Sequence, residues 1–144
     1  MDPKIFRAYD IRGKYPGEIN NETVERIVSS FISSQNSKIE IQKLAVVVGH
    51  DARISSPALY KSVLNSLRAK RYKVEAAGLI TTPMMYFLVN NLKADYGIMV
   101  TASHNPKEYN GLKVVGKDAK PISGIEIYKT INSKLKSQKH NQKV

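Results

Sequence analysis

The hexapeptide at residues 101–106 holds the residue types best suited to chemistry in this chain. It reads Thr-Ala-Ser-His-Asn-Pro and directly follows an apolar stretch. The hydroxyl of Ser103 could serve as a nucleophile or as the carrier of a phosphoryl group. Its Asn-Pro dipeptide and the later Asn110-Gly111 both favour turns, so the chain is expected to turn twice in quick succession. A polar loop that directly follows a buried strand is where α/β proteins usually place their chemistry.

The same loop admits two other interpretations. Asn, Ser and Pro all have local reasons to occupy turns, so the hexapeptide is also compatible with an ordinary polar turn. A serine hydrolase needs a base aimed at the nucleophile and an acid that orients the base. The chain has no Gly-x-Ser-x-Gly elbow, and the adjacent Ser103 and His104 are expected to point apart. Because no acid is obviously placed to orient His104, hydrolase chemistry is disfavoured.

The residues around the loop predict the elements that position it. Runs of β-branched and apolar residues predict buried strands, at residues 44–49, 74–80, 95–100 and 112–115. Apolar residues at helical spacing predict a helix over residues 21–34 and three later helices, which begin near residues 56, 82 and 123. Residues 6–13 are expected to be extended and to run into a turn.

Polar residues at the expected helix starts predict specific caps. Ser56 and Thr82 each precede a proline and are expected to cap their helices. Ser123 and Glu126 have the spacing of a capping box. The apolar residues of the third helix are expected to be Met84, Phe87 and Leu88.

The alternation of strands and helices predicts a three-layer α/β/α domain with a mixed, mostly parallel sheet. Strands joined by a helix are expected to lie parallel through right-handed crossovers. The strands at 95–100 and 112–115 are too close in sequence for such a crossover, so they are expected to pair antiparallel. This arrangement would place the hexapeptide at one edge of the sheet.

Composition is typical of a compact globular domain. The chain of 144 residues is long enough to bury a core, and its 42% hydrophobic and 24% charged content is ordinary. The absence of cysteine excludes a disulfide framework and a thiolate metal site. No apolar run approaches the roughly 20 residues that span a bilayer, and the first residues lack an apolar signal core. A cytoplasmic protein without a membrane partner is therefore expected.

Positive charge is concentrated near the C-terminal end. The net charge is +11, and residues 129–144 hold five lysines and no acid. We expect the domain to cover residues 1–138 and the polar, basic tail at 139–144 to begin an interdomain connection. Charge alone also admits a non-enzymatic module that binds nucleic acid or acidic partners. No interleaving of aromatic and basic residues supports that alternative, so no nucleic-acid partner is predicted.

Three motifs carry chemical residues at separate points of the chain. Residues 8–13 read Ala-Tyr-Asp-Ile-Arg-Gly, residues 49–53 read Gly-His-Asp-Ala-Arg, and Tyr-Asn-Gly-Leu-Lys follows the hexapeptide at 109–113. Together they resemble the α-D-phosphohexomutase superfamily, most closely its phosphomannomutase/phosphoglucomutase branch. The resemblance covers nearly the whole chain and matches the first of the family's four domains, which carries the catalytic serine.

The resemblance implies a role for each matching residue. Ser103 matches the serine that passes a phosphoryl group to a hexose phosphate, forms a hexose 1,6-bisphosphate and takes the other phosphate back. Lys113 matches an active-site lysine that accepts a proton or stabilises charge, and Arg12 matches an arginine at the transferring group. His104 matches the histidine beside the phosphoserine. Residues that match supporting positions for substrate or phosphate are Tyr9, Arg53 and Asn110. For Arg53, an ion pair at the approach to a helix is an equal alternative.

The resemblance also implies what lies outside this chain. The cofactor is Mg²⁺, to which the phosphate on Ser103 would supply one ligand. The other ligands belong to an Asp-Gly-Asp-x-Asp-Arg motif of the second domain, and this chain has no Asp-x-Asp pair. The expected partners are a hexose phosphate, its 1,6-bisphosphate and the missing domains, so this chain alone is expected to be inactive. A phosphoglucosamine mutase domain is the alternative within the superfamily.

Overall fold

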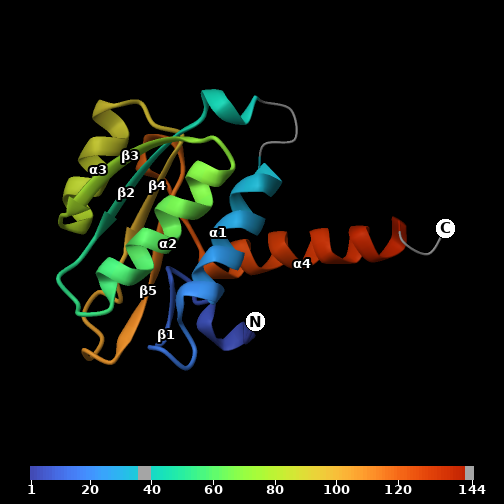
Figure 1. Ribbon diagram of the computed structural model, residues 1–144, viewed down its shortest axis with the longest axis horizontal. Helices are drawn as coiled ribbons and strands as arrows, with labels where there is room; N and C mark the ends of the chain where they lie inside the picture. Colours follow the sequence, from blue (N-terminus) through green and yellow to red (C-terminus); the bar gives the residue numbers. More distant parts are fainter. Residues whose placement is uncertain (36–39, 142–144) are drawn as a thin grey trace.

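The computed structural model describes residues 1–35 and 40–141 and has helices on both faces of a sheet (Figure 1). The strands are β1 (Ile11–Lys14), β2 (Ala45–His50), β3 (Lys73–Leu79), β4 (Tyr96–Val100), β5 (Tyr109–Val115) and β6 (Pro121–Ile122). The helices are α1 (Asn21–Gln35), α2 (Ser56–Ala69), α3 (Thr82–Asn91) and α4 (Gly124–Asn141). The predicted three-layer α/β/α fold is confirmed.

The strands form one mixed sheet in the order β1-β5-β4-β2-β3, with the short β6 paired to β5. β2 pairs in parallel with β3 and β4, whereas β5 pairs antiparallel with β1, β4 and β6. Among the described strands, β5 alone therefore runs against the others. The predicted antiparallel pair around the loop is confirmed, because residues 101–108 are too few for a helical crossover.

The two faces of the sheet pack against different helices. Successive residues of β2 point to opposite faces. Val46 and Val48 join the core beneath α1, α2 and α4, while Val47 packs with Met85 and Val89 of α3. The α3 layer packs against β2 and β4 and lies toward one side of the sheet (Figure 1). On that face of β5, Val115 joins the α3 core, whereas Lys113 is only partly buried.

The buried side of α3 differs from the prediction. Met85 and Val89 are buried, whereas Met84 and Phe87 are 50% and 64% exposed. Leu88 is partly buried against the α3 core. Because this helix is apolar on nearly every side, its periodicity could not show which side packs against the sheet.

The helix caps test the local sequence signals. Thr81, rather than Thr82, caps α3 by accepting a hydrogen bond from the N–H of Met84. The one-residue error is of the size expected at a helix end. The cap predicted for α4 is confirmed, since the hydroxyl of Ser123 accepts from the N–H of Glu126 at 3.0 Å.

Helix α4 extends beyond the three layers toward the C-terminus (Figure 1). Its residues 139–141 belong to the predicted polar tail and are helical, while residues 142–144 lie outside the described residues. The boundary at residue 138 stays a prediction. In the described part of the chain, no helix combines the length and apolar character needed to cross a membrane.

Candidate functional site

The serine loop, defined as residues 101–108, connects β4 to β5 at the carboxyl edge of the sheet. It lies beside the segment that follows β2, because the N–H of Asp51 donates to the carbonyl of Val100 at 3.0 Å. Thr101 and Ala102 are buried, and Ser103 is exposed. The loop therefore leaves the core within two residues and places the Ser103 side chain at the surface.

Ser103 has a left-handed backbone conformation, with a φ of 54°. This region is unfavourable for a residue that carries a side chain. Both backbone polar groups of Ser103 are held by side chains. Its N–H donates to Oγ1 of Thr101 at 2.9 Å, and its carbonyl accepts from Nη2 of Arg53 at 2.8 Å.

The imidazole of His104 lies near the Ser103 hydroxyl, so the expectation that the two side chains point apart is wrong. Nδ1 of His104 is 3.5 Å from Oγ of Ser103. Neighbouring side chains diverge in extended backbone, but these two residues lie in a turn. The separation is at the long limit of a hydrogen bond. No carboxylate is hydrogen-bonded to this imidazole within the described residues, so the arrangement lacks the orienting acid of a hydrolase triad.

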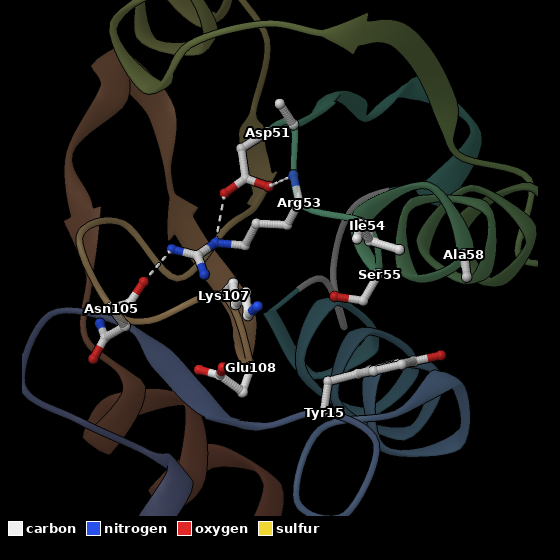
Figure 2. A pocket seen from close by; sticks show the side chains of 10 residues that line it. Tyr15, Asp51, Arg53, Ile54, Ser55, Ala58, Asn105, Lys107 and Glu108 are labelled. Atoms are coloured by element: carbon white, nitrogen blue, oxygen red, sulfur yellow. Dashed lines mark hydrogen bonds and ion pairs between the residues drawn. The ribbon is translucent and has the colours of Figure 1, made fainter.

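The side chain of Arg53 reaches from the β2 side into the serine loop (Figure 2). Its Nη1 and Nη2 donate to four carbonyls at 2.7–3.1 Å, which belong to Ser103, Asn105, Pro106 and Tyr109. Its Nε donates to Oδ2 of Asp51 at 3.1 Å. A guanidinium has five N–H donors, so all five have protein acceptors. Arg53 thus makes the ion pair considered from the sequence and also binds the serine loop.

The carboxylate of Asp51 accepts hydrogen bonds from three residues. Oδ1 accepts from the N–H of Arg53 at 3.1 Å and from the hydroxyl of Ser56 at 2.5 Å. Oδ2 accepts from the hydroxyl of Thr101 at 2.7 Å and from Nε of Arg53. Burial alone would raise the pKa of Asp51. The hydrogen bonds from Ser56, Thr101 and the Arg53 backbone, together with the charge of Arg53, outweigh burial and lower that pKa below its ordinary value.

Ser56 does not cap α2 as predicted. It is the first helical residue, and Ser55 occupies the cap position without a side-chain cap bond. The hydroxyl of Ser56 instead donates to Asp51 and accepts from Nδ2 of Asn110 at 3.0 Å. The hydroxyl thus makes a charge-assisted bond as a donor, and as an acceptor it pairs with Asn110 instead of a backbone N–H of α2. The start of α2 is thereby tied to the segments that flank the serine loop.

Asn110 is fully buried at the start of β5. Its Nδ2 also donates to the Ser55 hydroxyl at 2.7 Å, and its Oδ1 accepts from the N–H of Gly111 at 2.8 Å. These contacts hold β5 against the start of α2. The supporting role at substrate or phosphate that the sequence assigned to Asn110 stays a prediction.

Arg12 and Lys113 lie on one face of the sheet. Arg12 pairs with Gly111 across the β1–β5 ladder, and Lys113 follows two residues later on β5. Because alternate residues share a face, both side chains project on the face that bears Met99, the β4 partner of Lys113. A Cβ at Gly111 would lie 1.8 Å from the carbonyl oxygen of Ile11, so glycine permits the close approach of β1.

The structure does not join every predicted site residue to Ser103. Nε of Arg12 lies 3.6 Å from Oδ1 of Asp10, and the Arg12 side chain is 31% exposed. Tyr9 is 78% exposed, just before β1. Among the described residues, no hydrogen bond or ion pair connects Arg12, Lys113 or Tyr9 with Ser103. Arg12 and Lys113 share a face of the sheet, and the roles of all three residues stay predictions.

Comparison with known proteins decides the family. A family model described as phosphoglucomutase/phosphomannomutase, alpha/beta/alpha domain I, matches residues 3–142. The chain belongs to this family.

Relatives of this phosphoglucomutase/phosphomannomutase domain come from bacteria and archaea. It is 44% identical over 123 residues to "Phosphohexose mutases" of Xanthomonas campestris, covering 85% of this chain and 26% of that protein. It is 42% identical over 134 residues to the phosphomannomutase of Methanocaldococcus jannaschii, and the match covers 92% of this chain and 28% of that protein. The chain therefore spans about a quarter of the length of these relatives.

A solved structure supports the same assignment. The phosphoglucomutase/phosphomannomutase family protein from Burkholderia thailandensis matches with a TM-score of 0.75 and 31% identity. The match covers 92% of this chain and 31% of that protein. The fold of this domain is thus shared with an experimentally determined member of the family.

Two clefts of this mutase domain flank the serine loop. The larger, of about 810 Å³, lies behind the loop against the start of α2 and is lined in part by Tyr15, Ile54 and Lys107 (Figure 2). The smaller, of about 430 Å³, is lined in part by Met99 and Thr101. Met99 shares its sheet face with Lys113 and Arg12, so the smaller cleft lies on the face that bears these two side chains.

The described residues do not form a metal site by themselves. No group of three or more His, Asp or Glu side chains gathers in a way that could hold an ion within residues 1–35 and 40–141. Mg²⁺ is usually held by carboxylates together with phosphate and water. A phosphate on Ser103 would supply one oxygen donor, and the described side chains do not complete the set of ligands.

Asp51 and Thr101 are the site residues that sequence reasoning missed. Their side chains meet across 50 positions of sequence, and the contact becomes visible only when β2 and β4 lie side by side. A signal was present in the Asp-x-Arg spacing directly after a buried strand. It could have marked Asp51 as a partner for Arg53.

Proposed function

We propose that this chain is the phosphoserine domain of a phosphohexomutase. In this proposal, Ser103 carries a phosphoryl group that moves to and from hexose phosphates, with mannose and glucose 1-phosphate and their 6-phosphates as substrates. The family membership supports the reaction class. The observation that carries the proposal is the exposed Ser103 hydroxyl, presented by a backbone that is held on both sides.

The proposed reaction has two phosphoryl transfers. In the first, a sugar hydroxyl oxygen bonds to phosphorus and its proton passes to a base, while the Ser103 Oγ–P bond breaks and Oγ takes up a proton to become a free hydroxyl. The product is a hexose 1,6-bisphosphate. After it reorients, the Ser103 hydroxyl gives up its proton as Oγ bonds to the other phosphorus, and the sugar oxygen that leaves this phosphorus takes up a proton, so protons and phosphates balance. The net result is isomerisation of the hexose phosphate.

The chain's own residues have distinct parts in this proposal. Lys113 takes the proton of the sugar hydroxyl or offsets the charge on the moving group. Arg12 offers a planar set of donors that fits phosphate oxygens, on the same sheet face as Lys113. His104, with Nδ1 3.5 Å from the Ser103 hydroxyl, adjoins the phosphorylated oxygen. Tyr9 and Asn110 support substrate or phosphate from the neighbouring segments.

The proposal requires partners beyond these residues. The chain covers about a quarter of its relatives, so the sugar hydroxyls and distal phosphate are assigned to further domains of the same mutase. We also propose that Mg²⁺ is the metal, with most ligands supplied by those domains. The described residues do not form a complete ion site by themselves.

Substitution of Ser103 in the full-length mutase tests the proposal. Ser103→Ala should abolish conversion of glucose 1-phosphate to glucose 6-phosphate in a coupled assay, because the phosphoryl carrier is lost. Ser133→Ala is the matched control, since Ser133 is an exposed serine on α4. Normal turnover in Ser103→Ala would contradict the proposed function.

A further inference from the structure

We propose that Asp51, Thr101 and Arg53 form a positioning clamp that holds Ser103 in its left-handed conformation. These three residues are called the Asp51 clamp. Its consequence for catalysis rests on the function proposed above, whereas its effect on the loop can be measured without turnover. The clamp residues bind the backbone N–H and carbonyl of Ser103 and do not contact its hydroxyl. Any effect they have on the reaction therefore passes through the Ser103 backbone.

The clamp has two arms that meet at one carboxylate oxygen. In the first arm, the N–H of Ser103 donates to the hydroxyl of Thr101, which donates to Oδ2 of Asp51. In the second arm, the carbonyl of Ser103 accepts from Arg53, whose Nε donates to the same Oδ2. One carboxylate therefore anchors both backbone groups of the serine.

The left-handed backbone of Ser103 explains why these contacts to its N–H and carbonyl are needed. A left-handed residue other than glycine is roughly tenfold less populated than its right-handed alternative without added contacts. With a φ of 54°, Ser103 must be stabilised by its surroundings. Rotation of that residue would turn the hydroxyl away, and a misplacement of about 1 Å can cost roughly 10²-fold in rate.

Arginine is suited to this position in a way that lysine is not. Its guanidinium joins two successive turns, one closed by the Asn105 N–H on the Ala102 carbonyl and the next by the Tyr109 N–H on the Pro106 carbonyl. The four carbonyls lie in fixed directions and are matched by the four N–H groups on Nη1 and Nη2 of the planar guanidinium. A lysine has three donors on one atom and cannot satisfy this set.

The same contacts argue against direct phosphate binding by Arg53. All five N–H groups have protein acceptors, and only 13% of its side chain is exposed. Binding a substrate phosphate would require it to release part of the loop. Arg53 is therefore a positioning residue in this account, in contrast to Arg12.

Amide exchange in residues 1–144, followed by NMR, tests the clamp directly. In the unmodified chain, the Ser103 N–H should exchange at least about tenfold more slowly than in Thr101→Val, which lacks the hydroxyl. Thr101→Ser restores the hydroxyl and should restore protection. Thr130→Val is the control, because Thr130 lies on α4 and its hydroxyl donates to Glu126. An unprotected Ser103 N–H in the unmodified chain, a measurement that needs no variant, would overturn the clamp.

Kinetics of the full-length mutase test the catalytic consequence. Arg53→Lys and Thr101→Val should lower kcat about 10²-fold and change KM for hexose phosphate less than about threefold, since the clamp does not touch the sugar. Thr101→Ser should recover most of kcat. Unchanged kcat in a variant whose Ser103 N–H has lost protection would overturn the positioning role. Absence of Ser103 phosphorylation in the unmodified mutase would instead refute the proposed function, and the exchange result would still decide the clamp.

Discussion

Replacement of Asp51 by asparagine should destabilise the domain at neutral pH by an amount that the structure allows us to estimate. The carboxylate accepts four hydrogen bonds, two on each oxygen. In Asp51→Asn one oxygen becomes an NH₂ group, which faces two donors and can accept from neither. A hydrogen bond to a charged group contributes about 1.5–3 kcal/mol, so the loss of two predicts about 3 kcal/mol.

The destabilisation caused by Asp51→Asn should depend on pH, and the lowered pKa of Asp51 fixes the direction of that dependence. The pKa of Asp51 is lowered in the folded chain, so the carboxylate stabilises the fold fully above its ordinary pKa. This contribution disappears as the pH falls through the lowered value. The difference between the original chain and Asp51→Asn should therefore shrink between pH 7 and about pH 3.

Urea unfolding monitored by circular dichroism at both pH values would measure this difference. Glu75→Gln is a matched control, because Glu75 is an exposed acid on β3. Its stability should change by less than about 0.5 kcal/mol. A loss below about 1 kcal/mol for Asp51→Asn at pH 7, or a loss that grows in acid, would refute the reasoning about this carboxylate.

Three further predictions concern the site and its scaffold. Lys113→Met and Arg12→Ala should each lower kcat of the full-length mutase about 10²-fold or more with little change in Tm, and near-normal activity in both would contradict their roles. Gly111→Ala should cost about 3 kcal/mol in urea unfolding because its Cβ would lie 1.8 Å from the Ile11 carbonyl oxygen, whereas Gly17→Ala, with open space around it, should cost far less. Residues 1–144 alone should fold but show no mutase turnover and only weak Mg²⁺ binding by calorimetry, and robust turnover would overturn the proposed need for further domains.

The sequence predicted the scaffold well where each signal was local. The strands leading into and out of the serine loop follow from β-branched runs and from a connection too short for a helix. The stripe of α1 follows from apolar residues on one side and polar residues on the other. In α3 the same method failed because apolar residues surround the helix. Met84 was predicted to be buried, but the buried residue is its neighbour Met85.

Long-range contacts set the limit of the prediction at the site. Ser103 was found from its loop and its family resemblance, but Asp51 and Arg53, two of the side chains that hold its backbone, come from the end of another strand, β2. The hydroxyl of Ser56 illustrates the reason: local propensity favours a helix cap, whereas in the folded chain this hydroxyl donates to Asp51 and accepts from Asn110. For Arg53, sequence alone could not separate a phosphate contact from a structural one, because the four carbonyl acceptors gather only when the loop has folded.

The central claim is that Ser103 carries the phosphoryl group, and phosphate mapping tests it most directly. The full-length mutase would be incubated with glucose 1,6-bisphosphate and studied by intact-mass and peptide mass spectrometry. We predict the added mass of one phosphoryl group on Ser103, its loss on incubation with excess glucose 1-phosphate, and no such addition in Ser103→Ala. Stable phosphate on another residue, with none on Ser103, would contradict the account.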